Sequence, residues 1–228
     1  MTNHPGKFIV IDGSDGAGKK TQSDILIEKL KSEGREVAFY DFPQYTETLF
    51  GKMVGRYLNG EFGEADEVSP YLASLLYAGD RFQASNNIRR DLAAGKTVIS
   101  NRYIQSNMGF QTAKFQSNKE KEDFLAWLEE LEYQVYGIPK ADLVIYLFVP
   151  RQISQLLVDQ KAKRQYTEMT RDIHEKNDNF LDRVEQSYLW LSEKYPEWRK
   201  IDCAIDNKIL PIEDIAKKVF SIVIKEIL

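Results

Sequence analysis

The chain has 228 residues, of which 43% are hydrophobic, and its formal net charge at pH 7 is −4. This size and apolar fraction are typical of one large α/β domain, and the acidic balance argues against a nucleic-acid partner. The longest apolar runs, such as Leu143–Val149, are too short to span a bilayer, and no signal peptide is recognisable. Cys203 is the only cysteine, so no internal disulfide is expected. We therefore expect a cytoplasmic, single-domain protein over residues 1–228, without a membrane partner.

Short β-rich segments alternate along the chain with longer helical patterns. Strands are predicted at Phe8–Asp12, Glu36–Phe42, Thr97–Asn101, Leu143–Val149 and Trp198–Cys203. Helices are predicted at Lys19–Glu33, Ser69–Ala94, Asp123–Tyr136, Arg151–Lys163, Asn177–Lys194 and Ile212–Ile227. Several strands are apolar throughout, as in a parallel sheet covered on both faces. The pattern predicts a doubly wound, five-stranded parallel α/β sheet with helices on both faces, in which ligands bind at the carboxyl ends of the strands.

A glycine-rich loop follows the first predicted strand. It reads Gly13-Ser14-Asp15-Gly16-Ala17-Gly18-Lys19-Lys20-Thr21 and contains the motif G-x-x-x-x-G-K. Glycines let successive backbone N–H groups face phosphate oxygens, and the helix that begins near Lys19 adds the positive end of its dipole. Lys19 is expected to reach the β- and γ-phosphates of a nucleotide. The strand before the loop and the helix after it are the context that this P-loop motif requires.

Lys20 departs from the motif, which has Ser or Thr at this position to bind Mg²⁺. A protonated ammonium cannot be a metal ligand, and the Thr21 side chain is rotated by about 100° around the helix. We therefore expect Mg²⁺ to be held mainly by ATP phosphates and water, with no direct protein ligand. Two alternatives remain: Lys20 itself neutralises phosphate charge, or the site has degraded.

Six segments, in order, resemble the thymidylate kinases over nearly the whole chain. They are residues 13–22 (GSDGAGKKTQ), 41–46 (DFPQYT), 75–82 (LLYAGDRF), 101–103 (NRY), Ser106-Asn107 with Gln111, and 172–175 (DIHE). The resemblance implies a P-loop kinase that transfers the γ-phosphoryl group of ATP to dTMP, giving dTDP and ADP. It also implies a homodimer.

The long helix carries Tyr77 and Arg81, which face the same way because they are four residues apart. The resemblance implies that Tyr77 stacks on thymine and that Arg81 meets its O4 edge, although Tyr77 can also be a core aromatic. Asn107 and Gln111 would complete the hydrogen bonding to base or phosphate.

The sugar and phosphate of dTMP have their own predicted partners. The resemblance implies that Asp15 accepts from the sugar 3′-hydroxyl and that Tyr103 crowds the 2′ side. Arg102 directly follows an apolar strand, where it can grip the acceptor phosphate or form a structural salt bridge. The resemblance adds Phe42, Pro43, Tyr45, Asn101 and His174 to the dTMP site, and His174 can equally be a surface residue.

A basic stretch falls where related enzymes have a lid, here expected around residues 160–175. Because Gly16 stands where some members have an arginine in the phosphate loop, Arg164 or Arg171 is expected to stabilise transition-state charge. The alternative is a solvated helix end. The predicted catalytic residues are Lys19, Arg102, Arg164 and Asp15.

Three departures from the family pattern bear on the chemistry. Lys20 replaces a hydroxyl, Asn101 replaces an acidic residue, and Tyr45 stands where some members have arginine. The first two predict a site about two charges more positive than usual. They leave open a nucleotide-binding paralogue with weak activity, and another nucleotide or deoxynucleoside kinase is a further alternative.

Overall fold

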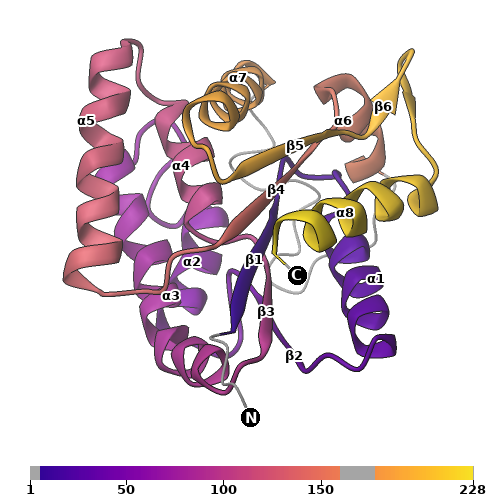
Figure 1. Cartoon of the computed structure of the whole chain (residues 1–228). Coiled ribbons are helices and arrows are strands. Elements are labelled where there is room, and N and C mark those ends of the chain that lie inside the picture. The colour runs from indigo at the N-terminus through magenta and orange to yellow at the C-terminus, as the bar shows by residue number, and fades with distance from the viewer. Residues whose placement is uncertain (1–5, 160–177, 228) are drawn as a thin grey trace.

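A five-stranded parallel sheet forms the centre of the computed structural model, which describes residues 6–159 and 178–227 (Figure 1). The strands are β1 (Lys7–Asp12), β2 (Val37–Asp41), β3 (Thr97–Asn101), β4 (Leu143–Phe148) and β5 (Trp198–Asp202), in the spatial order β2-β3-β1-β4-β5. Every predicted strand is confirmed to within one residue at each end. The doubly wound α/β fold is therefore confirmed.

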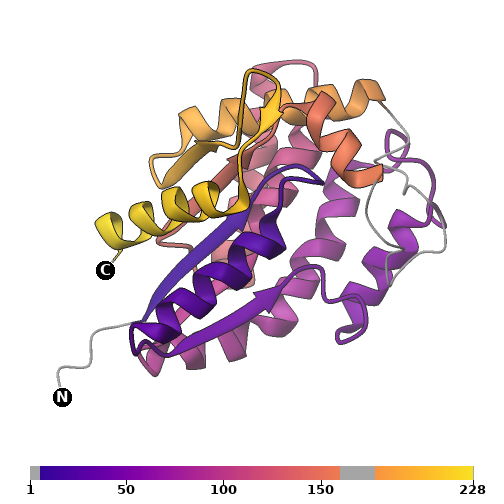
Figure 2. The same cartoon turned by 90° about the vertical axis from the view of Figure 1, so that its right-hand side faces the viewer.

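Helices cover both faces of the sheet. On one face lie α1 (Lys19–Ser32) and α8 (Ile212–Glu226), side by side (Figure 2). On the other lie α3 (Pro70–Ala93), α4 (Ile104–Thr112), α5 (Asn118–Glu129) and α7 (Asp178–Lys194). Helix α2 (Leu49–Leu58) packs on α3. The remaining elements are α6 (Arg151–Asp159), a π-helical turn (Glu130–Val135), and a hairpin of β6 (Ala204–Ile205) and β7 (Lys208–Ile209).

The two faces of β1 explain why its sequence is apolar throughout. Phe8 and Val10 join the hydrophobic cluster beneath α3, α4 and α7, whereas Ile9 and Ile11 join the cluster beneath α1 and α8. All four side chains are fully buried. Successive residues of a strand point to opposite faces, so a sheet covered on both sides needs apolar residues at every position.

Four helical elements differ from the sequence prediction. The structure adds α2 and α4, and the predicted helix Asp123–Tyr136 is instead α5, which begins at the capping box of Ser117 and Glu120, followed by the π-helical turn. Nearly all of α4 is buried, so it lacks the polar stripe by which an amphipathic helix is recognised. The predicted end of one helix at Lys163 and start of another at Asn177 lie outside the described residues.

Close packing between α4 and α7 generates a stability prediction. A methyl group added at Gly109 would lie 2.3 Å from Cε2 of the fully buried Tyr188. Gly109→Ala should therefore lower the free energy of unfolding by about 1–3 kcal/mol, as measured by urea denaturation. Asn87→Ala, at an exposed position of α3, is the control and should change it by less than about 0.5 kcal/mol. Equal stability of the Gly109→Ala variant and the parent would contradict this packing.

Candidate active site

The phosphate loop joins β1 to α1 at the carboxyl edge of the sheet. Gly13, Gly16 and Gly18 have φ angles of 148°, 82° and 79°, which L-residues with a side chain rarely adopt. A Cβ at Gly13 would lie 2.5 Å from the Leu147 carbonyl oxygen. The loop needs these glycines because its backbone turns sharply against β4.

Lys19 holds the loop in its curled form. The side chain is 7% exposed, and its Nζ donates to the carbonyl oxygens of Gly13 (3.0 Å) and Ser14 (2.7 Å). The ammonium is thus retained at the centre of the loop, from which it can exchange a carbonyl for a phosphate oxygen. The structure places Lys19 as the motif predicts, and its contact with nucleotide stays a prediction.

Lys20 turns outward along α1 instead. Its Nζ lies 2.5 Å from Oδ1 of Asp24 and 5.1 Å from the ring centroid of Phe39 on β2. The sequence analysis gave no role to Asp41, which lies at the end of β2. Its carboxylate accepts a 2.7 Å hydrogen bond from Asn101 Nδ2. Loss of hydration raises the pKa of Asp41, and the Asn101 hydrogen bond and the charge of Lys20 partly offset this rise.

The Asp41 carboxylate is a further charge at this edge. It accepts from Asn101 and lies in the field of Lys20, the two residues that depart from the family pattern. The predicted excess of positive charge over other family members stays a prediction. Among the described residues, no three His, Cys, Asp or Glu side chains gather as metal ligands. The expectation that magnesium is bound mainly through ATP phosphates and water stays a prediction.

Arg102 connects the phosphate loop to α4. Its backbone is left-handed (φ 63°), and its guanidinium lies 2.5 Å from Asp15 and donates to the Ser106 hydroxyl at 2.9 Å. Asp12 lies 3.8 Å away. Burial, the largest single influence, would lower the pKa of Arg102, but the electrostatic interactions with Asp15, Tyr188, Asp12 and Tyr45 together outweigh it and raise the pKa above its usual value. Arg102 is therefore paired with a carboxylate in this structure, and its predicted contact with the acceptor phosphate stays a prediction.

Two amide side chains of α4 lie in the interior. Asn107 contacts the hydroxyl (3.3 Å) and the carbonyl (3.4 Å) of Ser74. Gln111 is fully buried, yet neither its amide oxygen nor its nitrogen has a hydrogen-bond partner among the described residues. A buried amide without partners costs about 1–3 kcal/mol, so Gln111 needs a ligand or ordered water.

Arg81 is engaged inside the protein. Its Nε donates to Glu132 at 2.6 Å, its NH2 donates to the other carboxylate oxygen, and its NH1 donates to the Tyr103 carbonyl at 3.3 Å. Both side chains of this ion pair are buried. A contact of Arg81 with a base stays a prediction. Such a contact could use only those guanidinium N–H groups that are not bonded to Glu132.

Tyr103 is a core residue in this structure. It is fully buried, its hydroxyl donates to the Pro139 carbonyl at 3.1 Å, and its ring packs on Phe8 and Phe42. These contacts hold the ring of Tyr103 in the core, and its predicted position beside the sugar stays a prediction. The sequence indicated only that an aromatic residue follows Arg102, not which way it points.

The other predicted acceptor residues form a partly buried rim. Phe42 is buried before the cis bond to Pro43, while Tyr45 and Tyr77 are half-buried and pack against the cluster between α2 and α3. Tyr77 meets the ring of Tyr57 edge-on at 6.2 Å. Their predicted contacts with dTMP stay predictions.

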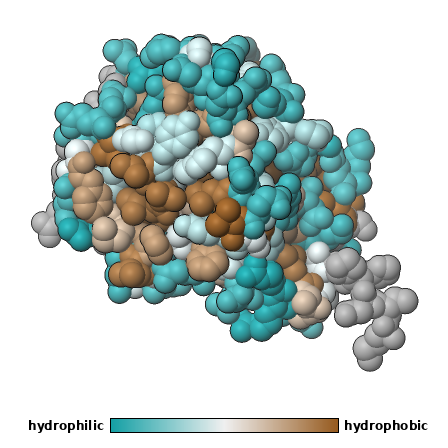
Figure 3. Space-filling view, turned by 90° about the vertical axis from the view of Figure 1, so that its left-hand side faces the viewer, coloured by the Kyte–Doolittle hydropathy of each residue, from teal (hydrophilic) through white to brown (hydrophobic). Residues whose placement is uncertain are grey.

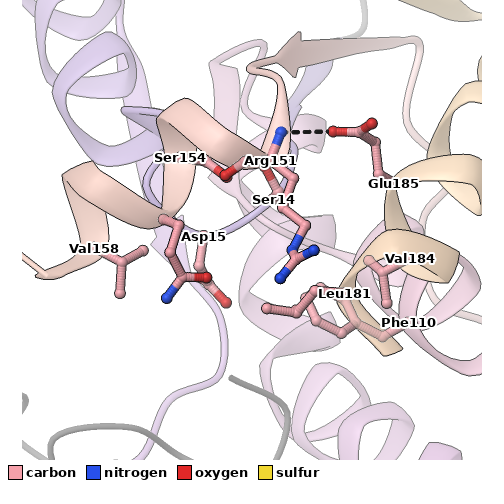
Figure 4. A pocket seen from close by; sticks show the side chains of 10 residues that line it. Ser14, Asp15, Phe110, Arg151, Ser154, Val158, Leu181, Val184 and Glu185 are labelled. Atoms are coloured by element: carbon pink, nitrogen blue, oxygen red, sulfur yellow. Dashed lines mark hydrogen bonds between the residues drawn. The ribbon is translucent and has the colours of Figure 1, made fainter. Parts of the chain in front are cut away.

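Phe110 lies next to predicted site residues, and the sequence analysis did not single it out. Its ring lies 5.7 Å below the Arg102 guanidinium carbon, and it borders a cavity beside Asp15 (Figure 4). The other lining residues are Ser14, Arg151, Ser154, Gln155, Val158, Leu181, Val184 and Glu185. A signal was present, because Phe110 follows Ser106 by four residues and so shares its helix face.

The predicted lid, residues 160–175, lies outside the described residues, and so do Arg164, Arg171 and His174. Their roles stay predictions. In the part of the chain that the structure describes, no helix is long and apolar enough to cross a membrane.

The buried pair of Arg81 and Glu132 generates a second stability prediction. Glu132→Gln should lower the free energy of unfolding by about 3–5 kcal/mol, because it leaves a buried guanidinium without its counter-charge. Glu122→Gln is the matched control: it breaks an exposed pair with Lys194 and should change stability by less than about 1 kcal/mol. Thermal and urea unfolding of the two variants would test this, and equal losses would contradict the assignment.

Comparisons with known proteins agree with this geometry. A sequence model of the thymidylate kinase family matches residues 11–214. A protein described as a probable thymidylate kinase from Thermococcus onnurineus is 32% identical over 226 residues, which cover 97% of this chain and 98% of the relative. The thymidylate kinase of Mycobacterium tuberculosis is 29% identical, covering 81% of this chain and 85% of its own.

A solved structure shares the fold. The thymidylate kinase of Candida albicans superposes with a TM-score of 0.73 at 23% identity, covering 97% of this chain and 92% of that chain. This likeness bears on the fold, whereas membership rests on the sequence matches. Because these sequence matches extend over most of its length, the chain belongs to the thymidylate kinase family.

Proposed function

We propose that the chain transfers the γ-phosphoryl group of ATP to the 5′-phosphate of dTMP. The observation that carries this proposal is Gln111, a buried amide whose donor and acceptor both lack protein partners. Thymine offers a matching edge, because its N3–H can donate to the amide oxygen while its O4 accepts from the amide nitrogen. Such a ligand would satisfy both groups, which are costly to leave buried without partners.

The two phosphates would meet between the loop and Arg102. The γ-phosphate rests on the backbone of Gly13–Thr21 with Lys19, and the acceptor phosphate displaces Asp15 from Arg102. An acceptor oxygen then attacks the γ-phosphorus in line, and the bond to the β,γ-bridging oxygen breaks to release ADP. Lys19 and Arg102 neutralise charge on the transferred group, and Asp15, once displaced, can accept from the sugar 3′-hydroxyl.

Magnesium would be held by the ATP phosphates and water, where it neutralises charge on the β- and γ-oxygens. Asp41 and Asn101 lie at the adjacent strand ends and could bind its water molecules. Tyr103 keeps its place as our proposed side chain at the 2′ side of the sugar, and Phe110, which borders the cavity beside Asp15, is a second candidate there. Arg164 or Arg171 remains our proposed additional cation for the transition state.

The remaining predicted residues would border the acceptor nucleoside. In this proposal Tyr77 and Phe42 supply apolar surface to the base, Asn107 adds an amide, and Pro43 and Tyr45 shape the rim. His174 keeps its place as a candidate contact.

We also propose that two copies of the chain associate. Apolar side chains gather on the face to the left in Figure 1, as Figure 3 shows. Large apolar side chains exposed on α3 and the π-helical turn include Leu72 (62%), Phe82 (47%) and Val135 (68%). A second copy that covers this face would remove them from water, consistent with the homodimer that the family resemblance implies.

Initial rates with different acceptors would test the function. We expect faster phosphorylation of dTMP than of dUMP, UMP, dCMP or AMP. Gln111→Ala should raise the KM for dTMP roughly tenfold and leave the KM for ATP unchanged, because two neutral hydrogen bonds to the base are lost. Gln116→Ala, an exposed amide just after α4, is the control.

Two outcomes would contradict the proposal. If dTMP reacted no faster than the other monophosphates, another nucleoside or nucleotide kinase activity would replace it. If the protein bound nucleotide without turnover at any magnesium concentration, it would be a non-catalytic paralogue.

Lys20 generates a prediction about magnesium. The natural protein should depend less steeply on Mg²⁺ concentration than the Lys20→Thr variant, because the ammonium supplies charge while threonine restores a metal-binding hydroxyl. Rates across a magnesium titration at fixed ATP and dTMP measure this. Lys20→Ala removes the charge without adding a ligand and so separates the two effects. Identical titration curves for parent and Lys20→Thr would refute this account of Lys20.

A further inference from the structure

The buried carboxylate of Asp12 is a meeting point of three elements. It is fully buried at the end of β1 and accepts hydrogen bonds from the Gly13 backbone (2.7 Å), the Ser106 hydroxyl (2.8 Å) and the Tyr188 hydroxyl (2.9 Å). Gly13 belongs to the phosphate loop, Ser106 to α4 and Tyr188 to α7. A carboxylate in this position is tolerated only when such donors surround it.

Arg102 is attached to this centre on one side. Its NH1 group donates to Ser106, which in turn donates to Asp12, and NH1 lies 3.8 Å from Asp12 itself. Its NH2 group faces Asp15. The guanidinium therefore has an inner end held by a buried network and an outer end whose present partner is 29% exposed. Only the outer end can change partners without uncovering a buried charge.

Tyr188 completes the network from the opposite side of the core. Its ring stacks on Tyr146 of β4 (centroids 5.2 Å apart, 17° between planes) and lies against Gly109 of α4. It is fully buried, so packing fixes the ring in one position. Because the ring is fixed by packing, the position of its hydroxyl, and so the hydrogen bond to Asp12, is fixed as well.

We propose that Tyr188 is a positioning residue for the acceptor phosphate. By donating to Asp12 it fixes the orientation of the carboxylate, and through Asp12 and Ser106 it directs Arg102 toward the phosphate loop. The inference rests on the proposed role of Arg102 at the phosphate of dTMP. The mutual hydrogen bonds of a buried network reinforce one another, so loss of one donor loosens the others.

Removing one hydroxyl tests this proposal. Tyr188→Phe keeps the ring and its packing, and should raise the KM for dTMP about five- to twentyfold while the KM for ATP stays within about twofold, because a hydrogen bond to a charged acceptor is lost. Tyr146→Phe is the matched control. It removes a hydroxyl from the stacked neighbour, for which no hydrogen bond is recorded among the described residues, and should leave both constants unchanged.

A double-mutant cycle then asks whether Tyr188 acts through Arg102. Calorimetric dTMP affinity should fall on Tyr188→Phe in the parent but not in an Arg102→Lys background. Additive losses, equal effects on the two substrates, or no effect would overturn the proposal. Ser106→Ala interrupts the same network from α4 and serves as a second variant if Tyr188→Phe does not fold.

A readout without substrate separates this proposal from the proposed function. The guanidinium NMR resonance of Arg102, identified by its absence in Arg102→Lys, should shift or broaden in Tyr188→Phe and stay unchanged in Tyr146→Phe. A resonance unaltered in both variants would overturn the positioning role. If the parent did not phosphorylate dTMP while the resonance responded as expected, the proposed function would fail and the link from Tyr188 to Arg102 would stand.

Discussion

The interaction of Arg102 with the carboxylates of Asp12 and Asp15 holds the active edge together. β1 and β3 end side by side, and each is followed by a tight turn that the other must accommodate. The left-handed backbone at Arg102 lets its N–H donate to the Ile11 carbonyl at 3.0 Å while its side chain crosses to the phosphate loop. Without this cation, the buried carboxylate of Asp12 and the partly exposed carboxylate of Asp15 would both lose a neighbouring positive charge.

Three buried polar side chains differ in whether the protein itself supplies their partners. Arg81 and Glu132 satisfy each other, so their energetic role lies in stability and their removal would be felt in folding. Gln111 has no such partner, so its burial makes sense only with a molecule at its side. The same physical rule, that buried polar groups must be paired, therefore separates a structural ion pair from a candidate recognition group.

Polar and charged groups from neighbouring strand ends meet at the active edge. Asn101, at the end of β3, donates to Asp41 at the end of β2, and the charge of Lys20 on α1 acts on the same carboxylate. Neighbouring parallel strands end at the same edge, so residues that are distant in sequence can interact electrostatically there.

The sequence by itself determined the sheet, the phosphate loop and the edge where chemistry occurs. Apolar strands and a glycine motif are local patterns, and each strand was predicted to within one residue. Only the tertiary structure decided which side chains face that edge. Tyr103 and Phe110 are both buried aromatic residues near Arg102, but the Tyr103 ring packs on Phe8 and Phe42, whereas Phe110 borders the cavity beside Asp15. The partner of Arg81, and the Ser106 and Tyr188 donors to Asp12, come from distant elements, and one sequence contains no direct signal for pairings made by packing.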